Sequence, residues 1–418
     1  MGGYWLIRID AGGWNATSGR VFFSVHRTNP PGGRVPPFNP QRSVRVIRHQ
    51  WNDCATAWIR QRNFRARHAT CFDLGVTHSN NNVTRLAMHL HRRITCLFVL
   101  SLTALASAIQ AAPLKIAYSD WPGWVAWEVA IQKGWIKQAG VDAEFLWFEY
   151  GPSMEAFTAG KVDAVMVTNG DSLVTGANGA KNTVIMLTDY SNGNDQIVAK
   201  AGIKSLKDLK GKKIGLEVGV VEHLMLLNAL KKIGLSEADV EIVNTPTGQT
   251  PQVLASGQVD AIAAWQPNAG QALKALAGST TIYSSADEPG LIYDTITVTP
   301  QSLAQHRADW VKLVAVWDRV LAYITDPATK PDALKIMAAR TGSTPEDYAA
   351  FISGTHFLSL ADGAKIIASK SVGFSSLNAS SAAANEFNVK NAVYKESQDV
   401  PSYVDAKLTG EAIAGVKK

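Results

Sequence analysis

Strand-like and helix-like segments alternate in the same order in two successive stretches of this 418-residue chain. Each stretch reads strand, helix, strand, helix, strand, an order that argues for parallel sheets covered by helices on both faces. The predicted strands lie at 114–118, 141–147, 162–167 and 183–187, then at 213–216, 240–243 and 259–264. The predicted helices lie at 124–140 and 154–159, then at 224–233 and around 253–255. We therefore expect an α/β protein with two doubly wound lobes around a cleft.

From about Leu303 the chain is predicted to be mostly helical. Apolar residues from Trp310 to Ile324 recur at helical spacing, with Trp310 and Trp317 expected in the core. The turn-rich stretch 189–195 suits a crossover between the lobes, and a return near 291–298 would let the C-terminal helices pack on the first lobe. The expected division is lobe 1 at 113–193 with 292–418, and lobe 2 at 194–291.

The formal net charge of +6 averages two segments of opposite sign. Residues 1–87 contain 12 Arg, no Lys and three acids, which gives +9, whereas residues 113–418 contain 27 Lys and Arg against 32 acids, which gives −5. Pro and Gly interrupt the basic segment, which shows no sustained helix or strand periodicity. We interpret residues 1–87 as over-extended upstream translation, with a disordered nucleic-acid or membrane arm as the alternative.

Residues 88–112 have the pattern of a secretory signal peptide. A basic stretch after Met88 ends at Arg93, an apolar run follows from Ile94, and Ala106 to Ala108 form a small-x-small cleavage site. The run is shorter than the roughly 20 residues that span a membrane. The three cysteines, Cys54, Cys71 and Cys96, all precede this site. We expect the mature chain to be periplasmic, free of cysteine and therefore without disulfides.

The sequence patterns of common enzyme and cofactor sites do not occur after residue 112. Neither G-x-x-x-x-G-K-[ST] nor G-x-G-x-x-G occurs there, so phosphate binding by those loops is not supported. A G-x-S-x-G elbow, an H-E-x-x-H motif and clustered His or Cys are absent from this part of the sequence as well. We therefore predict a binding protein with no catalytic residues, no metal and no cofactor.

Two segments ending in Gly-x-Val-Asp-Ala, one in each predicted lobe, lie at 151–164 and 254–261. Together with 118–124 and 265–267, they resemble the nitrate/sulfonate/taurine class of ABC-importer substrate-binding proteins over about residues 113–320. The resemblance implies a type II periplasmic-binding fold, capture of a small solute, and a membrane permease as partner. We further expect a monomer that binds no nucleic acid. Asp163 and Asp260 of the two segments are expected to cap or hydrogen-bond a turn rather than a ligand.

The carboxyl ends of the predicted strands are expected to face the cleft. Acids and aromatic residues gather at these ends, without Lys or Arg, at Asp120, Trp121, Trp124, Glu149, Tyr150, Asp171, Glu217, Glu222 and Trp265. A carboxylate beside aromatic faces suits a planar or compact cation, whereas an anion favours exposed N–H donors at helix N-termini. This composition therefore favours a cationic ligand over an anion.

Segments 119–124, 168–171 and 188–195 resemble one branch of that class in particular, the binding proteins linked to urea-carboxylase-type, guanidine-degrading gene sets. The resemblance implies guanidinium or a urea-like amide as the solute. The predicted ligand-binding residues are Asp120, Trp121, Asn169, Asp171, Glu217 and Trp265. The alternatives are a nitrate or taurine/sulfonate ligand within the same class, and a pyrimidine-synthase-like enzyme on the same fold.

Overall fold

The computed structural model describes residues 8–15, 20–26 and 112–416 of the chain. The chain divides into two compact units, 1–106 and 107–418, and each is described by itself. In the first unit, β1 (Arg8–Asn15) pairs with β2 (Arg20–His26) in antiparallel orientation. The structure thus places two strands in a segment whose sequence shows no sustained periodicity, and the β-branched and aromatic residues of 20–26 favour a strand. The other residues of the predicted upstream translation, and 88–111 of the predicted signal peptide, lie outside the described residues.

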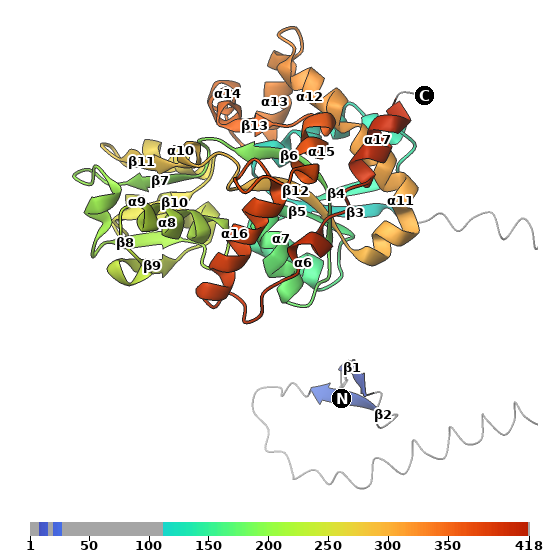
Figure 1. Cartoon of the computed structure of the whole chain (residues 1–418), viewed down its shortest axis with the longest axis horizontal. Helices are drawn as coiled ribbons and strands as arrows, with labels where there is room; N and C mark the ends of the chain where they lie inside the picture. The colour runs from blue at the N-terminus through green and yellow to red at the C-terminus, as the bar shows by residue number, and fades with distance from the viewer. Residues whose placement is uncertain (1–7, 16–19, 27–111, 417–418) are drawn as a thin grey trace, which may run out of the picture. The chain divides into compact units, whose positions relative to one another are not determined.

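A six-stranded sheet, in the order β13-β6-β12-β5-β3-β4, forms the centre of the first lobe within residues 112–416 (Figure 1). Its strands are β3 (Leu114–Tyr118), β4 (Ala143–Trp147), β5 (Ala164–Thr168), β6 (Thr183–Ser191), β12 (Tyr293–Val298) and β13 (Thr355–Phe357). Strands β3, β4 and β5 are parallel, but β12 runs antiparallel to both β5 and β6. The sheet is therefore mixed, not parallel as predicted, because the chain returns from the second lobe through β12.

The second lobe has a five-stranded sheet, in the order β11-β7-β10-β8-β9, in the same part of the chain. Its strands are β7 (Gln196–Ala199), β8 (Lys213–Leu216), β9 (Glu241–Asn244), β10 (Ala261–Ala264) and β11 (Thr280–Ser284). The strand β7 runs antiparallel to β10 and β11, so this sheet is mixed as well. The chain leaves the first sheet between β6 and β7 and returns between β11 and β12, while the predicted lobe boundaries themselves remain a prediction.

Helices pack around both sheets (Figure 1). In the first lobe they are α3 (Pro122–Val125), α4 (Trp127–Gln132), α5 (Trp135–Gln138), α6 (Tyr150–Thr158), α7 (Asn169–Ala177), α11 (Pro300–Ala315), α12 (Trp317–Thr325), α13 (Lys330–Thr341), α14 (Pro345–Ser353), α15 (Leu360–Ala368), α16 (Leu377–Lys390) and α17 (Leu408–Val416), with the 3-10 turn η6 (Val400–Tyr403). In the second lobe they are α8 (Val221–Lys232), α9 (Thr250–Ala255) and α10 (Asn268–Ala275), with the 3-10 turns η2 (Leu206–Leu209), η3 (Glu237–Asp239), η4 (Thr247–Gln249) and η5 (Ser285–Asp287). The predicted α/β class with C-terminal helices is thus confirmed.

The predicted helix at 124–140 is interrupted in the structure. Three short helices, α3 to α5, occupy this stretch, and Gly134 between α4 and α5 has a φ of 68°. A left-handed residue ends an α-helix, and Gly adopts this conformation without steric cost. Helical spacing of the apolar residues alone did not reveal this break.

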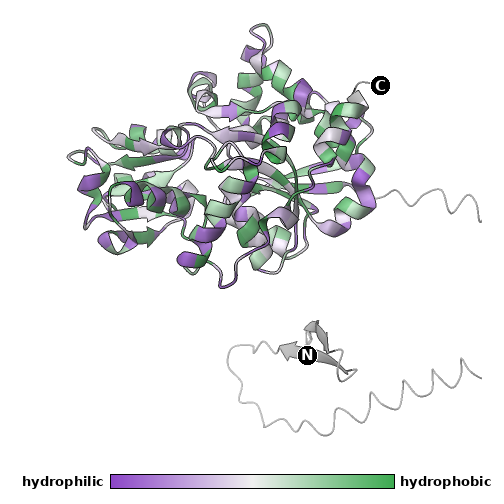
Figure 2. Cartoon of the chain, in the orientation of Figure 1, coloured by the Kyte–Doolittle hydropathy of each residue, from purple (hydrophilic) through white to green (hydrophobic). Residues whose placement is uncertain are grey.

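Apolar residues line the strands and the inner sides of the helices (Figure 2). Every residue of β5 is buried, as expected for a strand covered on both faces. Trp310 and Trp317 are fully buried, as predicted, and Trp317 stacks on Trp127 with ring centroids 5.3 Å apart. The described chain therefore has a continuous core of the size expected for two joined lobes.

The aspartates of the two Gly-x-Val-Asp-Ala segments occupy equivalent places in the two lobes. The side chain of Asp163 accepts a hydrogen bond from the backbone N–H of Lys115 at 2.9 Å, where β3 begins. The side chain of Asp260 accepts one from the backbone N–H of Lys213 at 2.9 Å, where β8 begins. The predicted structural role of both aspartates is thus confirmed.

Candidate functional site

A small cavity of about 10 Å³ lies where the two lobes meet. Its wall consists of Trp121, Trp124, Tyr150, Thr168, Asp195, Val221, Trp265, Ile292 and Asp294. These residues come from the carboxyl ends of strands, the helix starts that follow them, and both crossovers between the lobes. This is the place where doubly wound sheets bind ligands. The volume is near the minimum that holds one water molecule, so the lobes are closed around a compact space.

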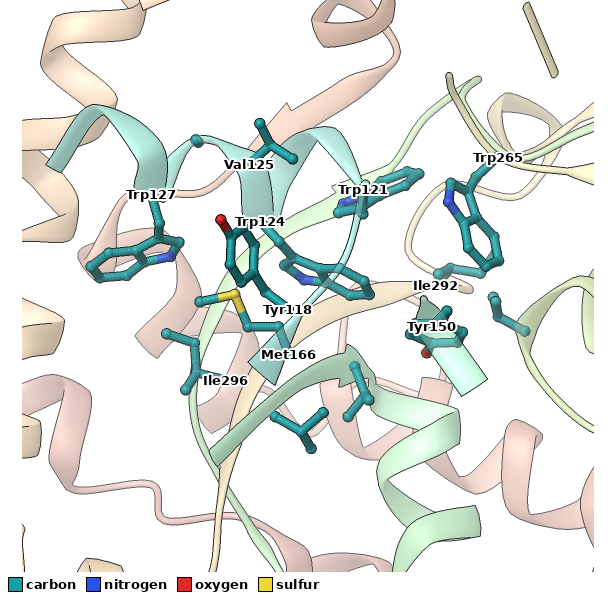
Figure 3. Packing of buried hydrophobic residues seen from close by; sticks show 14 of the residues in the cluster. Tyr118, Trp121, Trp124, Val125, Trp127, Tyr150, Met166, Trp265, Ile292 and Ile296 are labelled. Atoms are coloured by element: carbon teal, nitrogen blue, oxygen red, sulfur yellow. The ribbon is translucent and has the colours of Figure 1, made fainter. Parts of the chain in front are cut away.

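Aromatic rings form much of the cavity wall (Figure 3). Trp124 stacks on Tyr150 with ring centroids 5.6 Å apart and an interplanar angle of 16°. Trp265 of the second lobe meets Tyr150 edge to face at 5.1 Å. The indole Nε1 of Trp124 is buried without an acceptor. Aromatic side chains of both lobes therefore meet at the cavity.

Buried carboxyl groups accompany these rings. Asp195 and Asp294 line the cavity and are 2% and 1% exposed, while Asp189 and Glu222 stand next to them, fully buried. One carboxyl oxygen of Asp189, Asp195 and Asp294, and both oxygens of Glu222, are buried without a hydrogen-bond donor. Unpartnered buried carboxylates are costly, so this arrangement requires either protons or a bound cation.

Burial raises the pKa of these carboxyl groups. The pKa of Asp189 and the pKa of Asp195 each rise to about 6 through burial, against partial compensation by hydrogen bonds. The pKa of Glu222 lies well above its ordinary range because of burial and then the nearby charge of Asp195. The pKa of Asp294 lies well above its range through burial and the nearby charge of Asp189. The site therefore has a deficit of positive charge.

Two of the six predicted site residues line the cavity. Trp121 lies in its wall and donates its indole N–H to Asp189 at 2.9 Å. Trp265 lies in the opposite lobe and donates its indole N–H to Asp120 at 2.8 Å. Asn169, also predicted, donates to Ser380 and Ser381 of α16 and accepts from the backbone of Tyr293. The structure thus gives Asn169 internal partners away from the cavity wall.

The three predicted acids make contacts between the lobes. Asp120 accepts from Trp265 and, at 2.8 Å, from Asn268, both in the second lobe. Asp171 accepts from the hydroxyl of Tyr150 at 2.6 Å and from the backbone N–H of Val221 at 3.2 Å. Burial raises the pKa of Asp120 to about 6 and the pKa of Asp171 to about 7.

Glu217 extends the same pattern from the second lobe to the first. Its side chain accepts from the hydroxyl of Thr247 at 3.1 Å, and its Oε1 lies beside the α-carbon of Gly151 in α6, where an added Cβ would stand 2.4 Å from it. Burial raises the pKa of Glu217. Asp120 and Asp171 thus each accept a hydrogen bond from a donor of the opposite lobe, and Glu217 lies against that lobe at Gly151.

The sequence reading did not select Asp189, Asp195, Glu222 or Asp294 as site residues. Asp294 lies within β12 between Tyr293 and Thr295, and the available signal was an acid within a short strand of β-branched and aromatic residues. Asp189 lies in β6, which continues to Ser191 beyond the predicted strand. Because the sequence analysis assigns residues 189–195 to a turn between the lobes, it does not predict their side chains at a cavity.

The described residues provide neither a metal-binding cluster nor a membrane-spanning helix. Within 8–15, 20–26 and 112–416, His, Cys, Asp and Glu form no group of three or more arranged to hold a metal ion. The helices of these same ranges include none with the length and apolar character needed to cross a membrane.

The two lobes, their paired crossovers and the enclosed cavity define a protein with the periplasmic-binding-protein fold. Residues 121–330 match the model of the family described as NMT1/THI5 like, and the chain belongs to this family.

The named relatives are binding proteins. A Brucella abortus protein named as a binding protein is 30% identical over 200 residues, 47% of this chain and 62% of the relative, so the chain spans less than two thirds of that relative. The taurine-binding periplasmic protein of Escherichia coli is 25% identical over 261 residues, 59% of this chain and 75% of the relative. The structure of the alkanesulfonate-binding protein SsuA from Xanthomonas axonopodis pv. citri, bound to MOPS, has a TM-score of 0.60 at 18% identity, covering 71% of this chain and 99% of that one.

Proposed function

We propose that this chain is a periplasmic solute-binding protein that captures a small nitrogenous cation, guanidinium or a close analogue, and delivers it to an ABC-importer permease. The observation that carries the proposal is the cavity between the lobes, where Asp195 and Asp294 hold unpartnered carboxyl oxygens beside the rings of Trp124 and Tyr150. Membership of the family supports the capture of a solute, and the carboxyl groups of the cavity wall support a solute of positive charge.

The chemistry of the cavity wall favours a cation over an anion. The titratable groups that line it are Asp195, Asp294 and Tyr150, with no Lys, Arg or His among the lining residues. A guanidinium ion presents N–H donors along its edges and a flat face, so it would satisfy both the carboxyl oxygens and the aromatic rings. An alkyl sulfonate would bring an anionic group against a wall that contains two carboxyl groups and no basic side chain.

Ligand capture is proposed to proceed by lobe closure. Asp120 and Asp171 each accept a hydrogen bond from the opposite lobe and Glu217 lies against Gly151 of that lobe, so these contacts would form as the cleft closes. A solute that touches both lobes would favour the closed form, which the permease would recognise. On this proposal the chain acts by binding and catalyses no reaction.

A thermal-shift panel on the full chain tests the proposal. Guanidinium, urea, nitrate and taurine are compared at sub-denaturing concentrations and matched ionic strength. A ligand at about 100 times its dissociation constant should add about 2.7 kcal/mol, which raises the melting temperature by several degrees. The expected result is a rise with guanidinium and none with nitrate or taurine. A rise with nitrate or taurine alone would show that the carboxyl groups do not set ligand charge.

Variants assign such a response to the cavity. Asp294→Asn removes one cavity carboxylate while keeping its shape, and should weaken guanidinium binding roughly tenfold or more. Asp142→Asn is the matched control, because Asp142 is exposed on the same lobe. Equal affinities for the two variants would remove Asp294 from the site.

A further inference from the structure

Five carboxyl oxygens at or beside the cavity are buried without a hydrogen-bond donor. One oxygen each of Asp195 and Asp294 belongs to the cavity wall itself. A third belongs to Asp189, which lies opposite Asp294 in the pairing of β6 with β12. The remaining two are both oxygens of Glu222, which directly follows the wall residue Val221. A buried acceptor without a donor costs more than a typical hydrogen bond contributes when it is made, so these oxygens require donors.

The fold does not supply these donors. Three side chains of the wall donate to acids that are not part of it, in the pairs Trp121–Asp189, Trp265–Asp120 and Tyr150–Asp171. The indole N–H of Trp124 has no acceptor, so it reaches no carboxyl group. Among the described residues, no group donates to the unpartnered oxygens of Asp195 and Asp294. A bound molecule must therefore provide their hydrogen bonds.

An unsubstituted guanidinium ion meets this requirement because it carries N–H groups around its whole perimeter. Each of its edges presents two parallel N–H bonds, the arrangement that pairs with carboxylate oxygens. Its flat faces remain free for the stacked rings of Trp124 and Tyr150. Replacing one N–H by N–CH3 interrupts an edge, and it leaves a buried carboxyl oxygen without a donor.

Resting on the proposed function, we propose that the site selects the unsubstituted guanidinium ion over its N-alkyl derivatives, because it requires N–H donors at every edge of the ligand. Volume acts in the same direction, since the closed cavity of about 10 Å³ is near the minimum for one water molecule. The walls must already move apart to admit guanidinium, and a methyl group requires more space. An amino group separates the two contributions, because it is about as large as a methyl group but donates hydrogen bonds.

Calorimetry on the full chain compares guanidinium, methylguanidinium and aminoguanidinium as chloride salts near neutral pH, where each carries a single positive charge. We expect methylguanidinium to bind about tenfold more weakly than guanidinium, or weaker still, because a buried acceptor is left unpaired. Aminoguanidinium should bind more tightly than methylguanidinium, which has the same size and charge. Equal affinities for guanidinium and methylguanidinium, or equal weakening of both substituted ions, would overturn the donor requirement and leave the proposed function standing. If none of the three ions binds, the proposed function falls together with the inference.

Asp195→Asn tests whether the cavity wall sets the preference. The Asn side chain brings its own N–H donors, so fewer are required from the ligand. Guanidinium should bind about tenfold more weakly, and its advantage over methylguanidinium should narrow. Asp142→Asn, at an exposed position, is the control and should leave both affinities unchanged. An undiminished preference in a folded Asp195→Asn variant would overturn the inference, and the ligand series on the unchanged chain decides it where the variant fails to fold.

Discussion

Gly123 allows the backbone of α3 to lie directly against the carboxyl group of Asp189. A Cβ at this position would stand 1.8 Å from Asp189 Oδ2 and 2.4 Å from its Cγ, in a region where Asp189 is fully buried. Gly123→Ala must therefore displace Asp189, and should cost about 1–3 kcal/mol of unfolding free energy together with most of the guanidinium affinity. Chemical denaturation and calorimetry measure the two effects.

Gly410→Ala provides the control for this substitution. Gly410 lies exposed in α17, and a Cβ there meets no atom within 4 Å. Ala favours a helix over Gly, so this variant should be neutral or slightly stabilised. If Gly123→Ala is as stable as Gly410→Ala and still binds guanidinium, Asp189 is not held at the site by this close approach.

Asp120 connects the lobes, and its removal should weaken the binding of every ligand alike. In Asp120→Asn, the amide can accept from Trp265 or Asn268 but cannot replace both carboxylate contacts. The loss of one buried hydrogen bond to a charged group predicts about tenfold weaker guanidinium binding. Calorimetry with Asp142→Asn as control measures this. A change in preference between guanidinium and urea, rather than a uniform loss, would instead place Asp120 against the ligand.

At the residue scale, the sequence predicted the acidic and aromatic character of the site, but it did not predict most of the residues that provide this character. Trp121 and Trp265 line the cavity, and the excess of acids over basic residues at strand ends is present in the structure. The unpartnered carboxyl oxygens belong to Asp189, Asp195, Glu222 and Asp294. Asp294 lies in β12, the strand through which the chain returns from the second lobe. Which acid meets which donor depends on how the lobes close, and spacing along the chain does not encode that.

At the scale of elements, α16 joins the C-terminal part of the chain to the site. Asn169, the first residue of α7, donates to Ser380 and Ser381 of α16, and Ser380 in turn donates to the backbone of Leu291 beside β12. The aromatic ring of Phe387, also on α16, meets His223 of α8 edge to face at 5.6 Å. In Figure 1, α16 passes beside α7 and α8, so one helix contacts both lobes.

Asn169→Ala should therefore destabilise the whole fold rather than the site alone. The substitution leaves the buried backbone N–H of Tyr293 without its acceptor at 3.0 Å, which costs about 1–3 kcal/mol and lowers the melting temperature by several degrees. Asn178→Ala, at the exposed far end of α7, is the control. A normal melting temperature with lost ligand binding would show that Asn169 acts on the ligand, as the sequence reading predicted.

A helix or strand was predictable from the sequence where its apolar residues recur with a clear period. It was less predictable where the element begins with polar residues. The reading found β3 and β8 at their observed bounds, but not α7, whose first turn is Asn169-Gly170-Asp171. That helix begins because Thr168 caps it, accepting from the backbone N–H of Asp171 at 3.1 Å. Asn169 and Asp171 are predicted ligand-binding residues, and in the structure they also form the first turn of α7.

At the scale of the whole molecule, the fold class followed from the double alternation of strands and helices, but the return of the chain through β12 did not. That return brings Asp294 against Asp189 and produces an acidic centre inside a net acidic lobe pair. Groups with lowered pKa, such as Asp260 beside Lys200 and Asp405 beside Arg307, lie near the surface and titrate below the neutral range. Between about pH 5 and pH 8, the buried acids therefore dominate the dependence of stability on pH.

The ligand-free protein should accordingly lose stability as the pH rises from about 5 to about 8. Burial raises the pKa of Asp120 to about 6 and the pKa of Asp171 to about 7, from an ordinary value near 3.8. The folded state then binds more protons than the unfolded state between these values, so the unfolding free energy falls as the pH rises. For a carboxyl with a pKa near 6 the total loss is on the order of 3 kcal/mol, and about half of it falls above pH 5.

Thermal melts across this pH range, with and without guanidinium, check the prediction. The melting temperature of the ligand-free chain should be higher near pH 5 than near pH 8, and guanidinium should raise it most at the higher pH, because the cation replaces the lost protons. Glu222→Gln should flatten the dependence, since it replaces a buried carboxyl group of raised pKa with an amide that does not titrate, whereas Glu144→Gln should not. A melting temperature that rises with pH in the ligand-free chain would mean that the buried carboxyl groups are ionised and balanced within the fold.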